Sequence, residues 1–300
     1  IRESGDLANT PGITLEGTVG STTIERGVIC AQRHIHMTPE DALRLHVRDT
    51  GPRDDPHPLV LLHGGHGSWM HWVRNIEALS RQFRVLVPDL PGFGDSQDFA
   101  LPAHDPARLP ALVQSLEQCL DLLVPEQGVL LAGFSFGAAI AAQLAARVQR
   151  VERLVLLGTA GHGGRRREMA PLLDWRVDDL AAREAAWRQN LAAFMLSGPE
   201  AVDALALCVH GLSCEATRFR SKSISRGSAL QALLQDYRRP VLLVWGEADV
   251  TAEPMEAAES LAQGRAERDW TIVPRAGHWV QYECAPEVNL LMARWLQAQS

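Results

Sequence analysis

Residues 130–147 read LLAGFSFGAAIAAQLAAR, in which an apolar run leads through Gly133, Ser135 and Gly137 into an alanine-rich run. This order predicts a strand, a sharp turn and a helix, with Ser135 at the tip of the turn. Such a turn strains the serine backbone, and a side chain at either glycine would collide with the neighbouring strand or helix. The pattern therefore indicates a serine that is presented as a nucleophile rather than buried.

Three further stretches carry the groups that such a serine needs. Each reads as a strand that ends in a loop: PLVLLHGG (58–65), VLLVWGEAD (241–249) and WTIVPRAGHWVQYE (270–283). Asp249 and His278 lie in the second and third loops, so the chain order is nucleophile, acid, histidine. Loops that follow strands can bring distant residues together, and we expect Ser135, His278 and Asp249 to form a catalytic triad.

The chemistry of these groups follows from their residue types. A free serine hydroxyl is a weak nucleophile near neutral pH, so His278 is predicted to take the proton of Ser135. Asp249 is predicted to accept a hydrogen bond from the far imidazole nitrogen and to stabilise the imidazolium. The backbone N–H groups of Gly65 and Phe136 are predicted to form the oxyanion hole. Because these groups complete the machinery for acyl transfer, we expect no cofactor.

Residues from about Leu43 to Ser300 resemble the α/β-hydrolase superfamily over their whole length. Within it, three motifs are most similar to the meta-cleavage product hydrolases, which cut carbon–carbon bonds in ring-fission products of aromatic compounds: HGGHGSWMHWVRN (63–75), VLVPDLPGFGDS (85–96) and GHWVQYE (277–283). Those enzymes usually carry an asparagine directly before the serine, whereas this chain has Phe134.

Three functional hypotheses follow from the motifs and from this departure. We rank first the hydrolysis of a small, largely apolar or aromatic carboxylic ester through an acyl-enzyme. Carbon–carbon cleavage of a ring-fission dienoate ranks second. A non-catalytic α/β-hydrolase scaffold that binds a ligand or a partner is the alternative from another class.

Apolar runs alternate with helical patterns, which predicts an α/β fold with a mostly parallel central sheet flanked by helices. Strands are expected at Leu59–Leu62, Arg84–Pro88, Val129–Ala132, Val151–Leu157, Val241–Trp245 and Trp270–Val273. Between Gly158 and Pro240 the rhythm changes to helical patterns without strand signals, where this fold carries its lid. The predicted organisation is a hydrolase core at 43–158 and 241–300, a helical lid at 159–240, and an amino-terminal arm at 1–42.

Two segments at the ends of the core are predicted from periodicity. Leu43, Leu45 and Val47 alternate with polar residues, which predicts one half-buried strand. The segment from Pro286 to Gln299 carries apolar residues at helical spacing, which predicts a helix packed against the sheet.

The substrate pocket is predicted to be largely apolar, with Phe134, Trp69 and Trp279 among its lining residues. The resemblance to meta-cleavage product hydrolases implies a lid arginine that binds the substrate carboxylate with bidentate geometry. Arg218 and Arg220, in the segment ATRFRSKSISR (216–226), are the candidates for this role. The alternative for each is an ordinary surface arginine.

The amino-terminal arm follows a different pattern. ITLEGTVGSTTIERGVICAQRHIHMTPEDALRL (13–45) resembles part of the phosphate propanoyltransferases, in which a histidine pair in an RHIHM motif binds catalytic zinc. His34 and His36 match that pair, and residues two apart on a strand share a face. They are weak metal candidates because two ligands are too few and the family's other zinc ligands have no counterpart here. The arm is expected to be β-rich, and a relic acyltransferase is the function that it would suggest.

Composition places the chain among ordinary globular enzymes. A net charge of −7 gives no sign of nucleic-acid binding, and the apolar runs stop short of the roughly 20 residues that a membrane span needs. The five cysteines, an odd number without a CxxC pair, argue against a disulfide framework and a structural zinc site. We expect a cytoplasmic protein that binds a small-molecule substrate but no nucleic acid and no membrane, and homo-oligomer formation is left open.

Overall fold

The computed structural model describes residues 15–18, 31–35 and 43–298. Within these residues, nine strands form one sheet in the order β1-β2-β3-β5-β4-β6-β7-β8-β9. The strands are β1 (Leu15–Thr18), β2 (Ala31–Ile35), β3 (Leu45–Thr50), β4 (Leu59–Leu62), β5 (Val85–Pro88), β6 (Val129–Phe134), β7 (Val151–Leu157), β8 (Val241–Gly246) and β9 (Arg268–Val273). The α/β fold with a mostly parallel sheet is thus confirmed.

Strands β4 to β9 run parallel, and β1 to β3 add an antiparallel edge next to β5. All six strands predicted from the apolar runs are present, with bounds that differ by at most two residues. Every residue of β4, β5, β6 and β8 is buried, because helices cover both faces of this part of the sheet.

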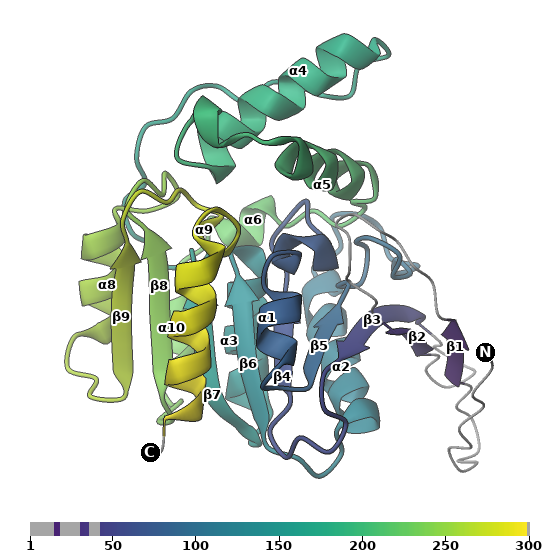
Figure 1. Cartoon of the computed structure of the whole chain (residues 1–300), viewed down its shortest axis with the longest axis vertical. Coiled ribbons are helices and arrows are strands. Elements are labelled where there is room, and N and C mark those ends of the chain that lie inside the picture. The colour runs from purple at the N-terminus through teal and green to yellow at the C-terminus, as the bar shows by residue number, and fades with distance from the viewer. Residues whose placement is uncertain (1–14, 19–30, 36–42, 299–300) are drawn as a thin grey trace.

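Alternate residues of the central parallel strands β4 to β8 enter two separate cores. In β4, Val60 and Leu62 belong to the core that also includes residues of α2 (Arg108–Leu123), α3 (Phe136–Arg147) and α8 (Pro254–Ala262). On the opposite face, Leu59 and Leu61 belong to the core that includes residues of α1 (Ile76–Ser80) and α10 (Ala285–Gln297). Figure 1 shows α1 and α10 in front of the sheet and α3 behind it. Helix α10 confirms the predicted carboxyl-terminal helix.

Strand β3 departs from the predicted half-buried pattern. Its polar residues His46 and Arg48 are only 1% and 3% exposed. The imidazole Nδ1 of His46 lies 3.1 Å from the carboxylate of Asp89, and the guanidinium of Arg48 lies 3.5 Å from the ring centre of Trp69. The polar face is therefore covered by the loop after β5 and by η1 (Trp69–Trp72), which contact its polar side chains.

A cap lies over the carboxyl ends of the parallel strands, and we use this name for residues 159–215. It begins with an irregular segment and continues with α4 (Leu180–Asn190), the π-helical turn η2 (Leu191–Met195), η3 (Pro199–Ala201) and α5 (Ala204–Glu215). Figure 1 shows α4 and α5 above the sheet, on the side to which the arrowheads of β8 and β9 point.

The end of the predicted lid packs on the core. After α5 the chain returns through α6 (Lys222–Ser225) and α7 (Leu230–Leu233), and both helices contact α3. Leu230 and Leu234 belong to the same core cluster as α2 and α3. Among the described residues, no helix combines the length and the apolar character that crossing a bilayer requires.

Candidate active site

Ser135 occupies the turn between β6 and α3 in a strained conformation. Its backbone angles are φ 53° and ψ −116°, a combination that side-chain-bearing residues rarely adopt. A Cβ on Gly133 would lie 2.4 Å from the carbonyl oxygen of Gly137, and a Cβ on Gly137 would lie 2.3 Å from the carbonyl oxygen of His63. Both glycines are thus required by close backbone contacts, as the sequence pattern suggested.

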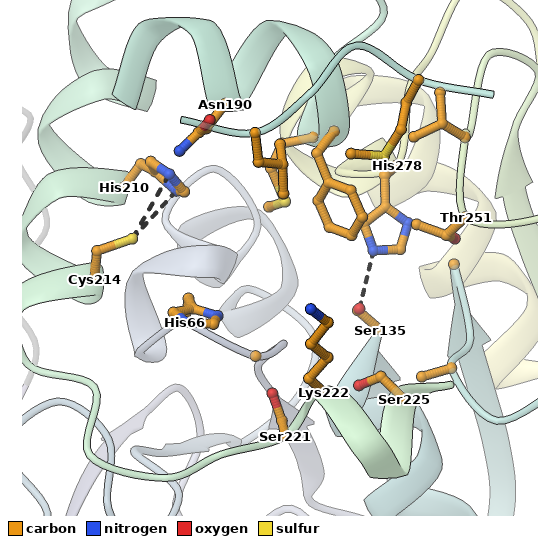
Figure 2. A pocket seen from close by; sticks show the side chains of 18 of the residues that line it. His66, Ser135, Asn190, His210, Cys214, Ser221, Lys222, Ser225, Thr251 and His278 are labelled. Carbon is orange, nitrogen blue, oxygen red and sulfur yellow. Dashed lines mark hydrogen bonds between the residues drawn. The ribbon is translucent and has the colours of Figure 1, made fainter. Parts of the chain in front are cut away.

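Ser135, His278 and Asp249 form one chain of hydrogen bonds. The Oγ of Ser135 lies 2.9 Å from Nε2 of His278, and Nδ1 of the same imidazole lies 2.8 Å from Oδ2 of Asp249. Figure 2 shows His278 pointing down to Ser135 at one end of a cavity. Three loops that are far apart in the sequence therefore bring a hydroxyl, an imidazole and a carboxylate into contact.

The carboxylate of Asp249 is completely buried, and both of its oxygens have hydrogen-bond partners. Its Oδ1 accepts hydrogen bonds from the backbone N–H and the hydroxyl of Thr251, at 2.7 and 2.8 Å. Burial alone would raise the pKa of Asp249, but the His278 imidazole and the hydrogen bonds from His278 and Thr251 outweigh burial and lower it. Asp249 therefore remains ionised where the imidazole needs a negative partner. The sequence analysis did not single out Thr251.

The loop that carries His278 is fixed by a second carboxylate. Glu283 accepts hydrogen bonds from the backbone N–H groups of Gly277 and Ser197, at 2.8 and 3.1 Å. A Cβ on Gly277 would lie 2.4 Å from the backbone of Leu196, so the loop and the cap touch directly beside the imidazole. The position of His278 thus depends on the cap as well as on the sheet.

The loop after β4 passes close to Ser135. The backbone N–H of Gly64 donates to Nδ1 of His71 at 3.2 Å, whereas no acceptor among the described residues receives the N–H of Gly65 or of Phe136. Phe136 is the first residue of α3, where helical geometry leaves the N–H without an intrahelical partner. These two amides are the ones that the sequence predicted for an oxyanion hole.

Two buried histidines support this loop as neutral groups. His63 accepts a hydrogen bond from the N–H of Leu90 at 2.9 Å, and its Nδ1 lies 2.8 Å from the carbonyl oxygen of Gly64. Burial lowers the pKa of His63, and burial together with repulsion from nearby histidines lowers the pKa of His71 well below its usual value. Both rings therefore act as hydrogen-bonding supports of the loop.

A cavity of about 690 Å³ opens between the core and the cap. Of the residues predicted for the site, Ser135, His278, Gly65 and Phe134 line it. The cap contributes Phe194, Asn190, His210 and Cys214. Figure 2 shows Asn190, His210 and Cys214 at the left of the cavity, on the side opposite His278.

Four residues predicted to bind substrate lie outside the cavity lining. Trp279 is buried against Tyr282 and donates to the carbonyl oxygen of His71 at 2.9 Å. Trp69 is buried under the guanidinium of Arg48. Arg218 is held by the carbonyl oxygens of Gly94, Ser96 and Ala216. The side chain of Arg220 is exposed on the surface.

The cations that do line the cavity are in other positions. Lys222 and Arg226 form no ion pair with a carboxylate among the described residues, and Figure 2 shows the Lys222 side chain reaching up into the cavity. Arg166 also lines the cavity, and its guanidinium donates to the carbonyl oxygen of Ser225 at 2.6 Å. Burial, followed by repulsion from Arg226, lowers the pKa of Arg166. The sequence placed these cations in two arginine-rich segments but gave no signal for which of them face the cavity.

The histidine pair of the arm is only partly described. His34 lies on β2, and His36 lies outside the described residues. Among the described residues, one group of at least three side chains has potential metal-ligand atoms that all lie within 4.8 Å of one another. It consists of His46, Asp89 and Asp95. Asp89 already accepts hydrogen bonds from the N–H groups of Trp69 and Asp95, at 2.7 and 3.1 Å, so it shapes its loop.

Residues 59–289 match the family model described as alpha/beta hydrolase family. The chain belongs to the alpha/beta hydrolase family. Residues 1–52 match the model of the phosphate propanoyltransferases, as the resemblance of the arm predicted.

Two curated relatives illustrate the range of this family. The chain is 30% identical over 257 residues to the dihydrolipoyllysine-residue acetyltransferase component of the acetoin cleaving system of Pseudomonas putida. This alignment covers 80% of this chain and 63% of the relative. It is also 27% identical over 277 residues to 2-hydroxy-6-oxononadienedioate/2-hydroxy-6-oxononatrienedioate hydrolase 2 of the same organism. This second alignment covers 85% of this chain and 92% of the relative. The chain thus spans less than two thirds of the first relative's length.

Solved structures with the same fold include hydrolases of two kinds. A carboxylesterase from Bacillus subtilis superposes with a TM-score of 0.67 at 22% identity, covering 90% of this chain and 93% of that one. A meta-cleavage product hydrolase from Pseudomonas fluorescens also gives a TM-score of 0.67, at 21% identity, covering 85% and 94%. At these identities the likeness concerns the fold.

Proposed function

We propose that this protein is a serine hydrolase that cleaves small, largely apolar or aromatic carboxylic esters. The observation that carries this proposal is the hydrogen-bond chain from Ser135 through His278 to Asp249, with Ser135 facing a cavity. Beside it lie the backbone N–H groups of Gly65 and Phe136, for which the described residues offer no acceptor. Nucleophile, base, orienting acid and oxyanion donors are the complete set that acyl transfer requires.

The reaction follows from these positions. The Oγ of Ser135 attacks the ester carbonyl carbon while Nε2 of His278 takes the hydroxyl proton. The electron pair of the carbonyl moves to its oxygen, which receives hydrogen bonds from the N–H groups of Gly65 and Phe136. Collapse of this intermediate expels the alcohol, which takes the proton from His278 and leaves an acyl-enzyme. Water then repeats the sequence on the acyl-enzyme, releasing the acid and restoring Ser135.

The wall of the cavity favours a small and mainly apolar acyl or alkyl group. Phe134, Phe194 and Met195 face it close to the triad, and Leu172 and Leu173 face it from the irregular part of the cap. Apolar walls with a few convergent polar groups are typical of small-molecule sites.

Carbon–carbon cleavage of a ring-fission dienoate is the second candidate. The observation that favours it is the presence of Lys222 and Arg226 in the cavity wall without carboxylate partners among the described residues, because such a substrate is an anion. The similarity to a hydrolase whose name specifies a dienedioate points the same way. Phe134 stands where the carbon–carbon hydrolases usually have asparagine, which is why we rank esters first.

Two measurements test the proposal. A fluorophosphonate probe should label the protein once, at Ser135, as located by peptide mass spectrometry. Hydrolysis of p-nitrophenyl esters of increasing chain length, measured beside hydrolysis of a ring-fission dienoate, then ranks the two substrate classes. Ser135→Ala should abolish labelling and turnover, whereas Ser260→Ala, which changes an exposed serine of α8, should leave both unchanged.

The results divide the hypotheses cleanly. Labelling with ester turnover supports the first candidate, and labelling with a much faster dienoate reaction supports the second. A well-folded protein that the probe leaves unlabelled would refute both and favour a binding scaffold.

A further inference from the structure

Ser221 is a buried polar residue whose hydroxyl has no hydrogen-bond partner among the described residues. It is only 4% exposed, yet its side chain lines the cavity. It stands at the amino-terminal cap of α6, where a serine hydroxyl commonly accepts a hydrogen bond from a backbone N–H of the first turn. Here the side chain makes no such bond. A serine that is buried and forgoes its capping bond has a hydroxyl available for something in the cavity.

The hydroxyl lies against the loop that carries Gly65. A Cβ built on Gly65 would lie 2.4 Å from Ser221 Oγ and 3.8 Å from the Cβ of Phe136. The Ser221 hydroxyl therefore lies next to Gly65, and Phe136 borders the same point of the loop. The N–H groups of Gly65 and Phe136, which have no acceptor among the described residues, are the ones that face the reacting carbonyl in the proposed mechanism. Figure 2 shows the Ser221 hydroxyl pointing up from the floor of the cavity, below His66 and to one side of Ser135.

The segment that holds Ser221 is anchored to the core on its amino-terminal side. The backbone N–H of Arg218 donates to the carbonyl oxygen of Gly92 at 2.8 Å. Phe219 is 4% exposed, and its ring lies 5.7 Å from the ring of Phe93 and 5.6 Å from that of Phe136. The same aromatic cluster thus holds both Phe136 and Phe219, the residue two positions before Ser221. The Ser221 hydroxyl is therefore kept at a fixed position relative to the N–H of Phe136.

We propose that Ser221 is a third donor of the oxyanion hole, contributing a side-chain hydroxyl beside the amides of Gly65 and Phe136. This inference rests on the proposed function and adds a catalytic residue to it. An alkoxide oxygen carries three lone pairs and can accept three hydrogen bonds, so a third donor finds an acceptor only when the negative charge has formed. Ser221 keeps its own proton throughout, and no bond to it forms or breaks.

The role predicts a kinetic pattern that a purely structural residue would not give. A donor that acts on the tetrahedral intermediate lowers kcat when it is removed and leaves KM nearly unchanged. Hydrogen bonds to charged groups suggest a drop of about 10- to 100-fold in kcat for Ser221→Ala. Affinity for a trifluoromethyl ketone, which forms a charged adduct with the active serine, should fall by a similar factor.

The experiment compares Ser221→Ala with Ser223→Ala, which removes an exposed hydroxyl from the same helix outside the cavity lining. For both variants and the unaltered protein, active sites are counted by fluorophosphonate end-point labelling, folding is checked by thermal melting, and kcat, KM and the inhibition constant of the ketone are measured on one p-nitrophenyl ester. We expect Ser221→Ala to lose kcat and ketone affinity together, with full labelling and an unchanged melting temperature. Ser223→Ala should match the unaltered protein.

Failure of this inference can be told apart from failure of the proposed function. If the unaltered protein is labelled and active but Ser221→Ala keeps kcat and ketone affinity within twofold, Ser221 is no oxyanion donor while the triad stands. A rise in KM with constant kcat would place Ser221 in ground-state binding and would also overturn the inference. An unlabelled and inactive unaltered protein would remove the proposed function itself, and the inference with it.

Discussion

The loops at the carboxyl ends of the parallel strands and the cap both line the cavity, but they differ in how tightly their residues are packed. Beyond the carboxyl ends of β8 and β9, Asp249, Thr251 and His278 are buried, and each has a partner at hydrogen-bond distance. In the cap, Leu172 and Leu173 are 50% and 49% exposed. The irregular segment that carries them is held by the Asn190 side chain, which accepts a hydrogen bond from the N–H of Leu173 and donates one to its carbonyl oxygen. The difference suggests that the core supplies the reacting groups, with the cap helping to hold the His278 loop, whereas substrate choice is left to the half-exposed residues of the irregular segment.

Charges follow the same division. In the core, the guanidinium of Arg84 is paired with the buried carboxylate of Asp49, at 3.0 Å. Facing the cavity, Lys222 and Arg226 have no carboxylate partner among the described residues. A cation that is left unpaired beside a cavity costs the free protein little while it stays hydrated, and it attracts an anionic ligand.

Replacement of Ser135 by alanine tests the core side of this comparison most strongly. We expect kcat/KM to fall by about 10⁴-fold or more, because the remaining groups can only bind substrate and polarise its carbonyl. The melting temperature should stay the same, since within the described part of the chain the Oγ forms one hydrogen bond, to His278. Steady-state kinetics and calorimetry check both parts, and a variant with substantial residual turnover would mean that another group is the nucleophile.

Gly137→Ala should break the turn itself. The new Cβ would lie 2.3 Å from the carbonyl oxygen of His63 and 2.5 Å from that of Leu62, and neither backbone atom can move cheaply. We expect the free energy of unfolding to fall by about 3 kcal/mol or more, measured by urea denaturation. Gly264→Ala is the control, because its Cβ would meet no atom within 4 Å and it carries only the strain of φ +68°. Equal losses in the two variants would contradict this account.

His210 tests the cap through the pH dependence of stability. Burial, followed by repulsion from His66, lowers the pKa of His210 from 6.5 to about 4. Above pH 6.5 the imidazole is neutral in both states; between pH 6.5 and pH 4 only the unfolded state takes up the proton, so stability falls as the pH falls. His210→Asn should remove up to about 3 kcal/mol of this loss at pH 4.

The measurement for His210 is urea unfolding of the variant and the unaltered protein across this range. His104→Asn, which changes an exposed histidine, serves as the control. An unchanged slope in His210→Asn would show that the imidazole is accessible to protons in the folded cap.

Lys222→Met addresses the selectivity of the cavity. Removing this cation should lower kcat/KM for an ester with a free carboxylate by about 10-fold relative to its neutral analogue. Arg220→Met is the matched control, because it removes one positive charge from an exposed position outside the cavity lining. The comparison uses paired kinetics at two salt concentrations. Equal effects of both variants would indicate general attraction by the field of the protein instead of a local contact.

Leu172→Ser should produce the smallest change in stability. The residue is already half exposed, so we expect the free energy of unfolding to change by no more than about 0.5 kcal/mol. Turnover of long-chain esters should fall while that of acetate esters stays the same, as shown by kcat/KM across chain lengths. A large loss of stability would show that the cap is packed as tightly as the core.

Sequence reasoning worked where a local pattern had a single physical solution. The glycines around Ser135, set between an apolar run and an alanine-rich run, favoured a tight strand-to-helix turn, and the short apolar runs between helical patterns favoured buried strands. Six strands were accordingly predicted to within two residues. It failed where burial depends on distant partners. The polar face of β3 is buried because Asp89 and Trp69, more than twenty positions away, cover His46 and Arg48.

The cavity wall shows the same limit. Trp69, Trp279, Arg218 and Arg220 were expected to contact substrate because they have suitable chemistry near the motifs, yet none lines the cavity. Lys222, one position beyond a buried serine on a short helix, does line it. Nothing in local spacing distinguishes Arg220 from Lys222, since the segment lacks a long regular periodicity that would fix which side chains face inward.

By itself, the sequence determined the order of strands and helices, the strained turn at Ser135, and the loops in which Asp249 and His278 lie, because short-range sterics and hydrophobic periodicity specify these locally. Only the tertiary structure decided that the three side chains meet within hydrogen-bond distance, which cations face the cavity, and that Ser221 lies beside Gly65. These contacts join residues far apart in the chain, and their geometry depends on how sheet, cap and return segment pack together.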